Sequence, residues 1–345
     1  MIRRGVDRWL QRVWYGDSAA RWILLPLSWL YGAVVLLRKA LFEAGVLKSE
    51  HPGVPVIVIG NLTAGGTGKT PVTIWLADEL KQRGFNPGIV SRGYGGSKSG
   101  SPMRVDGASD PAVVGDEPVL LARRTGLPVA VDSDRARAAR TLVEEGVDLI
   151  VTDDGLQHLK LGRDYEICVI DGNRGLGNRM LLPAGPLREP AARLEQVDQI
   201  LVNGRCPDDA ETANEQNAIG FELRTGDLCR LNGSLSRPIE RFADTTVHGV
   251  AAIGNPTRFF DTLRSAGIQV IEHPLPDHVK PSRSDLSFGD DFDVVMTEKD
   301  AVKLGSNLSD RFWYVPVDLY IDPVEAGPWL EQVVSRLRGG TEDGE

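Results

Sequence analysis

The residues with the clearest chemical meaning form a glycine-rich stretch that ends in a lysine and a threonine. Residues 65–70 read GGTGKT and follow a short apolar run at 54–59. A strand, a glycine-rich loop and a helix in this order gather backbone N–H groups, a helix N-terminus and a lysine charge around a phosphate. The expected nucleotide-binding residues are Thr63, Ala64, Gly65, Gly66, Thr67, Gly68, Lys69 and Thr70, with the Thr70 hydroxyl also a ligand of Mg²⁺.

The loop departs from the standard phosphate-loop pattern at one position. That pattern, G-x-x-x-x-G-K-[ST], asks for glycine at position 63, where this chain has Thr63. A glycine-rich turn that binds nothing is therefore the alternative. The apolar run before the loop, and the helical pattern that begins near Pro71, favour the phosphate site.

A pair of acids closes a second apolar strand further along the chain. Asp153 and Asp154 end the segment 148–155, which reads DLIVTDDG. The carboxyl ends of parallel strands meet at one edge of a sheet, so this pair should lie opposite the glycine-rich loop. Carboxylate oxygens suit Mg²⁺, which keeps its other positions for water and phosphate oxygens. The expected metal ligands are Thr70, Asp153, Asp154 and Glu117.

Asp116 and Glu117 open a helix directly after Gly115. Carboxylates in the first turn of a helix are commonly only partners of the helix dipole. At the active edge of a sheet they could also act on a substrate, and the residues alone leave both interpretations open.

A further group of residues is predicted to meet the substrate's phosphate or sugar. Arg92 and Tyr94 follow a predicted strand, although an ordinary glycine-rich loop is an equally good interpretation of their spacing. His158 lies just beyond the acid pair and could bind a ligand or simply begin a helix. Arg188 and Glu189 belong to a proline- and glycine-rich passage that is typical of a binding loop.

Composition indicates a globular protein with a reduced, cytosolic environment. With 345 residues, 41% of them hydrophobic, the chain is long enough for two α/β domains. Cys168, Cys206 and Cys229 are scattered without a C-x-x-C pair, so neither a disulfide framework nor a zinc site is indicated. The net charge of −9 and the lack of a basic-aromatic pattern argue against a nucleic-acid partner.

The first fifty residues differ in character from the rest of the chain. They hold eight basic and four acidic residues, a net charge of +4, and four of the seven tryptophans. Residues 22–37 form an uncharged run of 16 residues, about 24 Å as a helix and short of the ~30 Å hydrocarbon core. Pro26 is expected to kink or delay the helix. We expect a helix that lies in the membrane interface rather than spanning it; helices packed on the soluble body are the alternative.

Alternating strands and helices predict an α/β fold. We expect a P-loop NTPase-like, mostly parallel sheet domain, a second, smaller α/β domain, and an N-terminal membrane-associated helical segment. Predicted strands include 165–171, 199–203 and a terminal strand at 313–321. The expected parts are N-terminal helices (1–50), a P-loop kinase domain (51–215), a hairpin hinge (216–231), the smaller domain (232–338) and a disordered tail (339–345).

The order of motifs resembles the tetraacyldisaccharide 4′-kinase family, the lipid A 4′-kinases. The matching segments, spread over residues 50–305, are GNLTAGGTGKTP, SRGYGG, GDEP, DDGLQH, PAGPLRE, GNPTRFF, PDH and TEKDAVK. The resemblance implies transfer of the ATP γ-phosphate to the 4′-hydroxyl of a tetraacylated glucosamine disaccharide 1-phosphate, a late step of lipid A biosynthesis. It implies ATP and Mg²⁺ as cofactors and the cytoplasmic face of the inner membrane as the location, with peripheral or N-terminal anchoring. The implied partners are the lipid precursor and the membrane surface, and no obligate protein partner is evident.

The resemblance also implies a catalytic pair, in which Asp116 accepts the proton of the sugar hydroxyl and His278 from the second domain supports it. The phosphate-loop pattern adds Lys69 as a catalytic residue that bridges the β- and γ-phosphates. A site shared by two domains would be complete only when they close, which protects ATP from water. Val279 and Pro281 stand where the family more often has polar or aromatic residues, which puts the conformation of that loop in doubt.

Two functions from other classes are compatible with a phosphate loop. A membrane-associated P-loop ATPase switch usually carries a lysine near the start of its loop, where this chain has residues 61–64, NLTA. A non-catalytic nucleotide-binding scaffold would bind ATP without turnover. The acids at 116–117 and 153–154 argue against such a scaffold.

Overall fold

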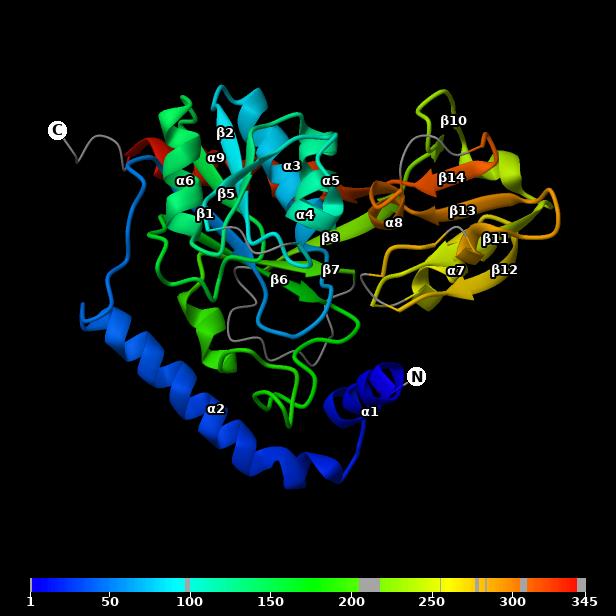
Figure 1. Ribbon diagram of the computed structural model, residues 1–345. Coiled ribbons are helices and arrows are strands. Elements are labelled where there is room, and N and C mark those ends of the chain that lie inside the picture. The colour runs from blue at the N-terminus through cyan, green and yellow to red at the C-terminus, as the bar shows by residue number, and fades with distance from the viewer. Residues whose placement is uncertain are drawn as a thin grey trace.

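The molecule consists of two α/β domains side by side and a pair of N-terminal helices that lie along one side of the larger domain (Figure 1). The computed structural model describes residues 2–96, 100–204, 218–254, 256–276, 279–282, 284–304 and 309–339.

The larger domain is built on a nine-stranded sheet. All neighbouring strands are parallel except at the two edges, where β3 and β15 run antiparallel to their neighbours. The register pairs Val58 of β1 with Thr152 of β5, so the two strands end at the same edge. The strand order is β15 (Val317–Tyr320), β8 (Ala218–Thr225), β7 (Gln199–Asn203), β6 (Tyr165–Asp171), β1 (Val56–Gly60), β5 (Leu149–Thr152), β2 (Pro87–Ser91), β4 (Val129–Val131) and β3 (Met103–Val105).

Helices cover both faces of this sheet because its central strands are apolar on both sides. One face packs against α6 (Arg135–Glu144) and the loop that leads into the 3₁₀ helix η1 (Ala191–Gln196). The other packs against α3 (Lys69–Gln82) and α9 (Pro323–Gly339), where Trp329 stacks on Trp75. The short helix α4 (Pro111–Val114) and α5 (Asp116–Thr125) cover the β2–β4 end.

The smaller domain has a six-stranded sheet with helices on its two faces. Apolar side chains of α7 (Pro256–Ser265) pack on one face and those of α8 (Glu298–Val302) on the other. The 3₁₀ turns are η3 (Ile239–Phe242) and η4 (Ser284–Leu286). The strand order is β10 (Ser236–Arg237), β9 (Leu228–Arg230), β14 (Phe312–Val315), β13 (Asp293–Thr297), β11 (Thr246–Ala251) and β12 (Gln269–Pro274).

The chain crosses between the sheets twice, which corrects the predicted hinge and terminal strand. Strands β8 and β9 do not form a hairpin, because β8 pairs with β7 and β15 while β9 pairs with β14. The predicted single strand at 313–321 is divided by Pro316, whose ring removes the N–H that a continuous ladder would need. Its second half, together with α9, belongs to the larger sheet, so the range 232–338 is not one domain.

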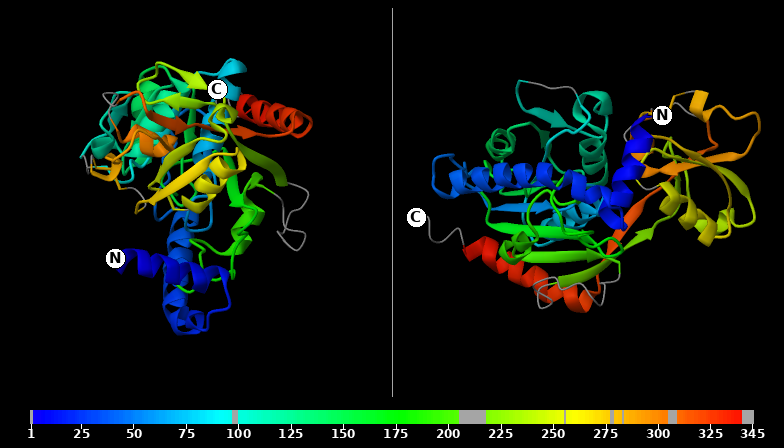
Figure 2. Two further views of the ribbon diagram at one scale, coloured as in Figure 1. Left: turned by 90° about the vertical axis from the view of Figure 1, so that its right-hand side faces the viewer. Right: turned by 90° about the horizontal axis from the view of Figure 1, so that it is seen from below.

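The N-terminal helices are α1 (Ile2–Tyr15) and α2 (Ala20–Glu43), and α2 runs across the underside of the larger domain (Figure 2). With 24 residues α2 is about 36 Å long. It is long and apolar enough to cross a membrane by length and composition. Pro26 was expected to kink or delay the helix, and of these two effects the delay was wrong, because α2 begins at Ala20 and Pro26 lies inside it.

One side of α2 is fixed to a loop of the larger domain by polar contacts. The Ser28 hydroxyl donates to the carbonyl of Leu181 at 2.9 Å and accepts from the N–H of Ala184 at 2.9 Å. The Tyr31 hydroxyl donates to the carbonyl of Arg188 at 3.0 Å. The opposite side leaves large apolar side chains exposed, among them Trp22, Ile23, Leu27, Trp29, Leu30, Val34 and Leu37.

Candidate active site

The glycine-rich loop joins β1 to α3 at the carboxyl edge of the larger sheet. Gly68 precedes α3 with a φ of 101°, in the left-handed region where a side chain would be strained. Gly65 and Gly66 are exposed, while Thr67 is buried and its carbonyl accepts a hydrogen bond from Asn203 Nδ2 at 3.2 Å. The loop therefore presents glycine backbone to solvent directly before a helix N-terminus.

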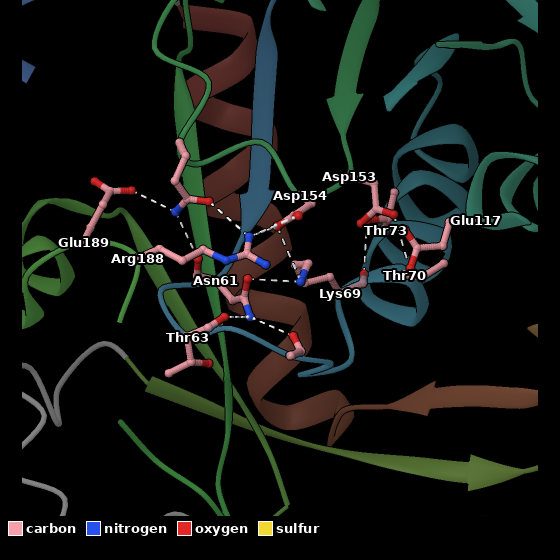
Figure 3. Close-up of polar contacts among 12 residues, drawn as sticks. Asn61, Thr63, Lys69, Thr70, Thr73, Glu117, Asp153, Asp154, Arg188 and Glu189 are labelled. Atoms are coloured by element: carbon pink, nitrogen blue, oxygen red, sulfur yellow. Dashed lines mark hydrogen bonds and ion pairs between the residues drawn. The ribbon is translucent and has the colours of Figure 1, made fainter. Parts of the chain in front are cut away.

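Lys69 lies at the centre of the polar cluster in Figure 3. Its Nζ donates to Asn61 Oδ1 at 3.0 Å and lies 3.5 Å from Asp154 Oδ1. Arg188 Nη1 contacts both oxygens of Asp154, at 3.0 and 3.2 Å. Two basic side chains from different parts of the chain thus converge on one carboxylate.

The two neighbouring acids have opposite electrostatic environments. Burial and the nearby negative charge of Glu117 raise the pKa of Asp153 to about 7. Burial also acts against the charge of Asp154, but Lys69 and Arg188 outweigh it and lower the pKa of Asp154 to about 2. Asp154 is therefore ionised at neutral pH, whereas Asp153 is only partly ionised there, and a further cation nearby would favour its ionised form.

Asp153 is 2% exposed, and hydroxyl groups surround its carboxylate. Thr70 Oγ1 lies 3.3 Å from Oδ2, and Thr73 Oγ1 lies 3.4 Å from Oδ1. Figure 3 shows Glu117 beside Thr70 and Asp153. This set of hard oxygen donors around a carboxyl with a raised pKa fits Mg²⁺.

The structure brings the predicted acids of α5 next to lysines of the smaller domain. Asp116 is 6% exposed, and its Oδ2 lies 3.6 Å from Lys303 Nζ. Glu117 Oε1 accepts from Lys299 Nζ at 2.9 Å. Lys299 belongs to α8 and Lys303 follows it, so both acids lie at the contact between the domains.

Two predicted nucleotide-binding residues hold the loop in place through their backbone. The Thr63 carbonyl accepts from Asn61 Nδ2 at 2.8 Å, and Thr63 forms a β-bridge with Leu187. The Ala64 N–H donates to the Pro186 carbonyl at 2.8 Å. In this conformation the Ala64 N–H is engaged within the protein, which disagrees with its expected role as a phosphate donor.

Among the predicted substrate-binding residues, Arg188 reaches the acid pair and Arg92 and Tyr94 are exposed after β2. Glu189 is buried, accepts from Gln157 Nε2 at 2.8 Å, and lies 3.5 Å from Arg193. The described contacts thus place Glu189 as a support of the loop. His278 falls outside the described residues, so its expected role stays a prediction.

His158 lies at the start of α6, where its Nε2 accepts from the Arg135 N–H at 3.3 Å. Burial, with the nearby charge of Arg135, lowers the pKa of His158 to about 4. The histidine is therefore neutral at physiological pH and accepts a hydrogen bond at the N-terminus of α6. It does not begin a helix of its own, and its expected contact with a ligand stays a prediction.

Sequence reasoning missed five residues of the site. Asn61 directly follows β1 and Asn203 is the last residue of β7, positions at the carboxyl ends of strands that could have identified them. Gln157 bridges the loop to Glu189, with its Nε2 also 3.1 Å from the Asn61 carbonyl. Lys299 and Lys303 belong to the TEKDAVK segment, which carried the family resemblance but received no role, because no local pattern shows that it faces α5.

Comparison with known proteins identifies the family. The model of the tetraacyldisaccharide-1-P 4′-kinase family matches residues 20–335. The chain belongs to the tetraacyldisaccharide 4′-kinase family. The tetraacyldisaccharide 4′-kinase of Nitrosococcus oceani is 46% identical over 328 residues, which cover 95% of this kinase and 94% of that one. The enzyme of Alkalilimnicola ehrlichii is 50% identical over 318 residues, 92% of this kinase and 94% of that one.

A solved structure supports the same assignment. The crystal structure of LpxK from Aquifex aeolicus in complex with ATP is similar to this kinase with a TM-score of 0.76 at 29% identity. The similarity covers 92% of this kinase and 99% of that chain. The predicted α/β class and the predicted family are thereby confirmed.

We expect the contribution of Asp153 to the stability of the nucleotide-free kinase to fall as the pH rises from about 4 to about 7. Over this range the Asp153 carboxyl is protonated in the folded chain but ionised in the unfolded chain, so folding must take up a proton, which costs more as the pH increases. In an Asp153→Asn variant residue 153 stays neutral, so its free energy of unfolding does not include the pH-dependent loss that Asp153 causes. At about 1.4 kcal/mol per pKa unit, the free energy of unfolding of the variant minus that of the wild type should increase by ~2–4 kcal/mol between pH 4 and pH 8.

Urea unfolding of both proteins in EDTA at a series of pH values measures this gain. The control is Asp291→Asn, because Asp291 is exposed. A stability difference between the wild type and Asp153→Asn that does not change with pH would contradict the raised pKa.

Proposed function

We propose that this kinase transfers the γ-phosphate of ATP to the 4′-hydroxyl of a tetraacylated glucosamine disaccharide 1-phosphate. The observation that carries the proposal is the meeting of a lysine-bearing glycine loop, an acid pair and the α5 acids at one sheet edge (Figure 3). Phosphoryl transfer depends mainly on positioning and charge stabilisation, and this arrangement supplies both.

The glycine loop and the start of α3 would hold the triphosphate. The N–H groups at a helix N-terminus favour an anion, and Lys69 adds a full positive charge. Lys69 Nζ lies 3.5 Å from Asp154 Oδ1, and a bound ATP would draw it toward the β- and γ-phosphates. Arg188 Nη1 lies 3.0 Å from Asp154 Oδ1, so this ion pair would keep the carboxylate ionised when Lys69 binds the nucleotide.

Thr70 and Asp153 would hold Mg²⁺, with Asp154 and Glu117 close by. A bound Mg²⁺ would neutralise charge on the phosphate oxygens during transfer. Asp153 supports this assignment because its burial and raised pKa make the ionised form dependent on a nearby cation. Thr70 Oγ1 already lies 3.3 Å from Asp153 Oδ2, so both donors come from a fixed arrangement.

Asp116 would accept the proton of the sugar hydroxyl, with His278 as its supporting partner. Asp116 begins α5 next to Glu117, and Figure 3 shows Glu117 beside Thr70 and Asp153. The carboxylate is buried at the contact between domains, where it is shielded from bulk water. A base in such a position can take a proton from an alcohol while water is kept from the γ-phosphate.

The exposed side of α2 would lie in the cytoplasmic face of the inner membrane, where the acylated substrate resides. Ile23 is 80% exposed, Trp29 68% and Leu30 65%. Burial of each such side chain in lipid is worth about 1.5–3 kcal/mol. The other side of α2 is fixed to the loop that carries Arg188, so an interfacial position would keep the site close to the lipid surface.

We expect Asp116→Asn to lower kcat by ~10²–10⁴ with little change in ATP affinity, because the amide cannot accept the hydroxyl proton. The assay follows ³²P from γ-labelled ATP to tetraacyldisaccharide 1-phosphate in detergent micelles. The control is Asp291→Asn, at an exposed acid of the smaller domain. Normal turnover by Asp116→Asn would remove it from the role of base, and label released only as inorganic phosphate would indicate an ATPase.

We expect the triple substitution Ile23→Gln, Trp29→Gln and Leu30→Gln to weaken binding to vesicles at least tenfold, because the apolar surface that enters the lipid is lost. Co-sedimentation with vesicles that contain anionic lipid measures the binding. The control is Val324→Gln, since Val324 is also 80% exposed but begins α9 in the larger domain. Unchanged sedimentation of the triple variant would contradict the membrane role of α2.

A further inference from the structure

A single lysine of the smaller domain connects the proposed base to two other segments. Lys303 is 5% exposed, and its ammonium group has three oxygen neighbours. Its Nζ donates to Asp300 Oδ1 at 2.8 Å and to the Val279 carbonyl at 3.3 Å, and lies 3.6 Å from Asp116 Oδ2. The three neighbours come from α8, from the segment that follows residue 278, and from α5 of the other domain.

Asp300 holds the lysine in position. It is fully buried, and its second oxygen accepts from the Ala252 N–H at 2.8 Å and the Thr297 hydroxyl at 2.7 Å. Thr297 also accepts from the N–H of Asp300 as the N-terminal cap of α8. The Lys303 ammonium keeps one orientation because it is paired with this fixed carboxylate. Separating the two would leave both charges buried and uncompensated.

The distance to Asp116 matters for the chemistry. A normal N–H···O hydrogen bond spans about 2.7–3.2 Å, and the Lys303–Asp116 separation of 3.6 Å is longer. The ammonium therefore attracts the carboxylate without a short bond to it. Such a charge fixes the direction of the carboxylate, whose other oxygen, Oδ1, accepts from the Glu117 N–H at 3.0 Å.

We propose that Lys303 is a positioning residue for phosphoryl transfer, which orients the Asp116 carboxylate and ties it to the segment after residue 278 when the two domains are in contact. The inference rests on the proposed role of Asp116 as the base. Lys303 acts through Asp116 and contacts neither nucleotide nor sugar in this account. The site is thus complete only when α8 is packed against α5.

The test is a double-mutant cycle between Lys303→Met and Asp116→Asn, measured by transfer of ³²P from ATP to tetraacyldisaccharide 1-phosphate. We expect Lys303→Met to lower kcat ~10- to 100-fold while the KM for ATP changes less than about threefold. In the Asp116→Asn background the same change should lower kcat less than about twofold, because the group that Lys303 orients is already lost.

The control for a general loosening of the domain contact is Arg124→Met. Arg124 forms an ion pair with Glu298 at 2.8 Å across the same contact, and its other described ion pair is with Asp318. The Arg124→Met substitution should lower kcat less than about threefold. An equal fall in kcat for Arg124→Met and Lys303→Met would overturn the inference.

Thermal unfolding checks that Lys303→Met is folded. If it is not, the variant Lys303→Met with Asp300→Asn removes both buried charges, and the amide can still accept from the Ala252 N–H. Normal kcat in a folded Lys303 variant, or the same loss with and without Asp116, would overturn the inference. If instead Asp116→Asn alone has normal kcat, the assignment of the base falls, and this inference with it.

Discussion

The structure of this kinase depends on how it neutralises two adjacent carboxylates at the end of β5, Asp153, which is buried, and Asp154, which is half-buried. Asp154 obtains its cations from Lys69 and Arg188, while the Asp153 carboxylate has the hydroxyls of Thr70 and Thr73 as its described hydrogen-bond partners. A carboxylate with hydroxyl partners in a buried site favours its protonated form until a cation arrives. Asp154 thus already has cationic partners within the protein, whereas the carboxylate of Asp153 is suited to a metal ion bound with its nucleotide.

Sheet geometry makes this arrangement possible. The parallel register of β1 and β5 brings the glycine loop and the acid pair to one edge, and α3 carries Lys69, Thr70 and Thr73 toward it on one helix. The loop from 181 to 188 completes the site from another direction. It receives the hydroxyls of Ser28 and Tyr31 from α2 and sends Arg188 to Asp154, so the apolar helix and the acid pair are joined through one loop.

The strands and the phosphate loop could be predicted because their signals are local. The strands at 165–171 and 199–203 have the predicted bounds, and the central strands are apolar on both faces. The exchange of strands between sheets could not be predicted in this way. Pro316 interrupts the run at 313–321, but only the tertiary pairing shows that the halves on either side of it belong to different sheets.

The residues of the site could also be predicted where their signals are local, and not where they depend on contacts between distant segments. Lys69, Thr70, Asp153 and Asp154 lie together as expected, because each follows a strand or begins a helix at the same edge. The engagement of the Ala64 N–H by Pro186 and the approach of Lys303 to Asp116 depend on contacts between distant segments. Sequence spacing carries no information about such contacts, so these residues became visible only in the folded chain.

The most direct test of the account compares Lys69→Met with Lys81→Met, an exposed lysine on the same helix. Transfer of ³²P from γ-labelled ATP to the 4′-position of tetraacyldisaccharide 1-phosphate is measured for both. The account predicts a loss of at least ~10³-fold in kcat/KM for Lys69→Met and a rate close to that of the wild type for Lys81→Met. A Lys69→Met enzyme that labels the lipid at an undiminished rate would contradict it.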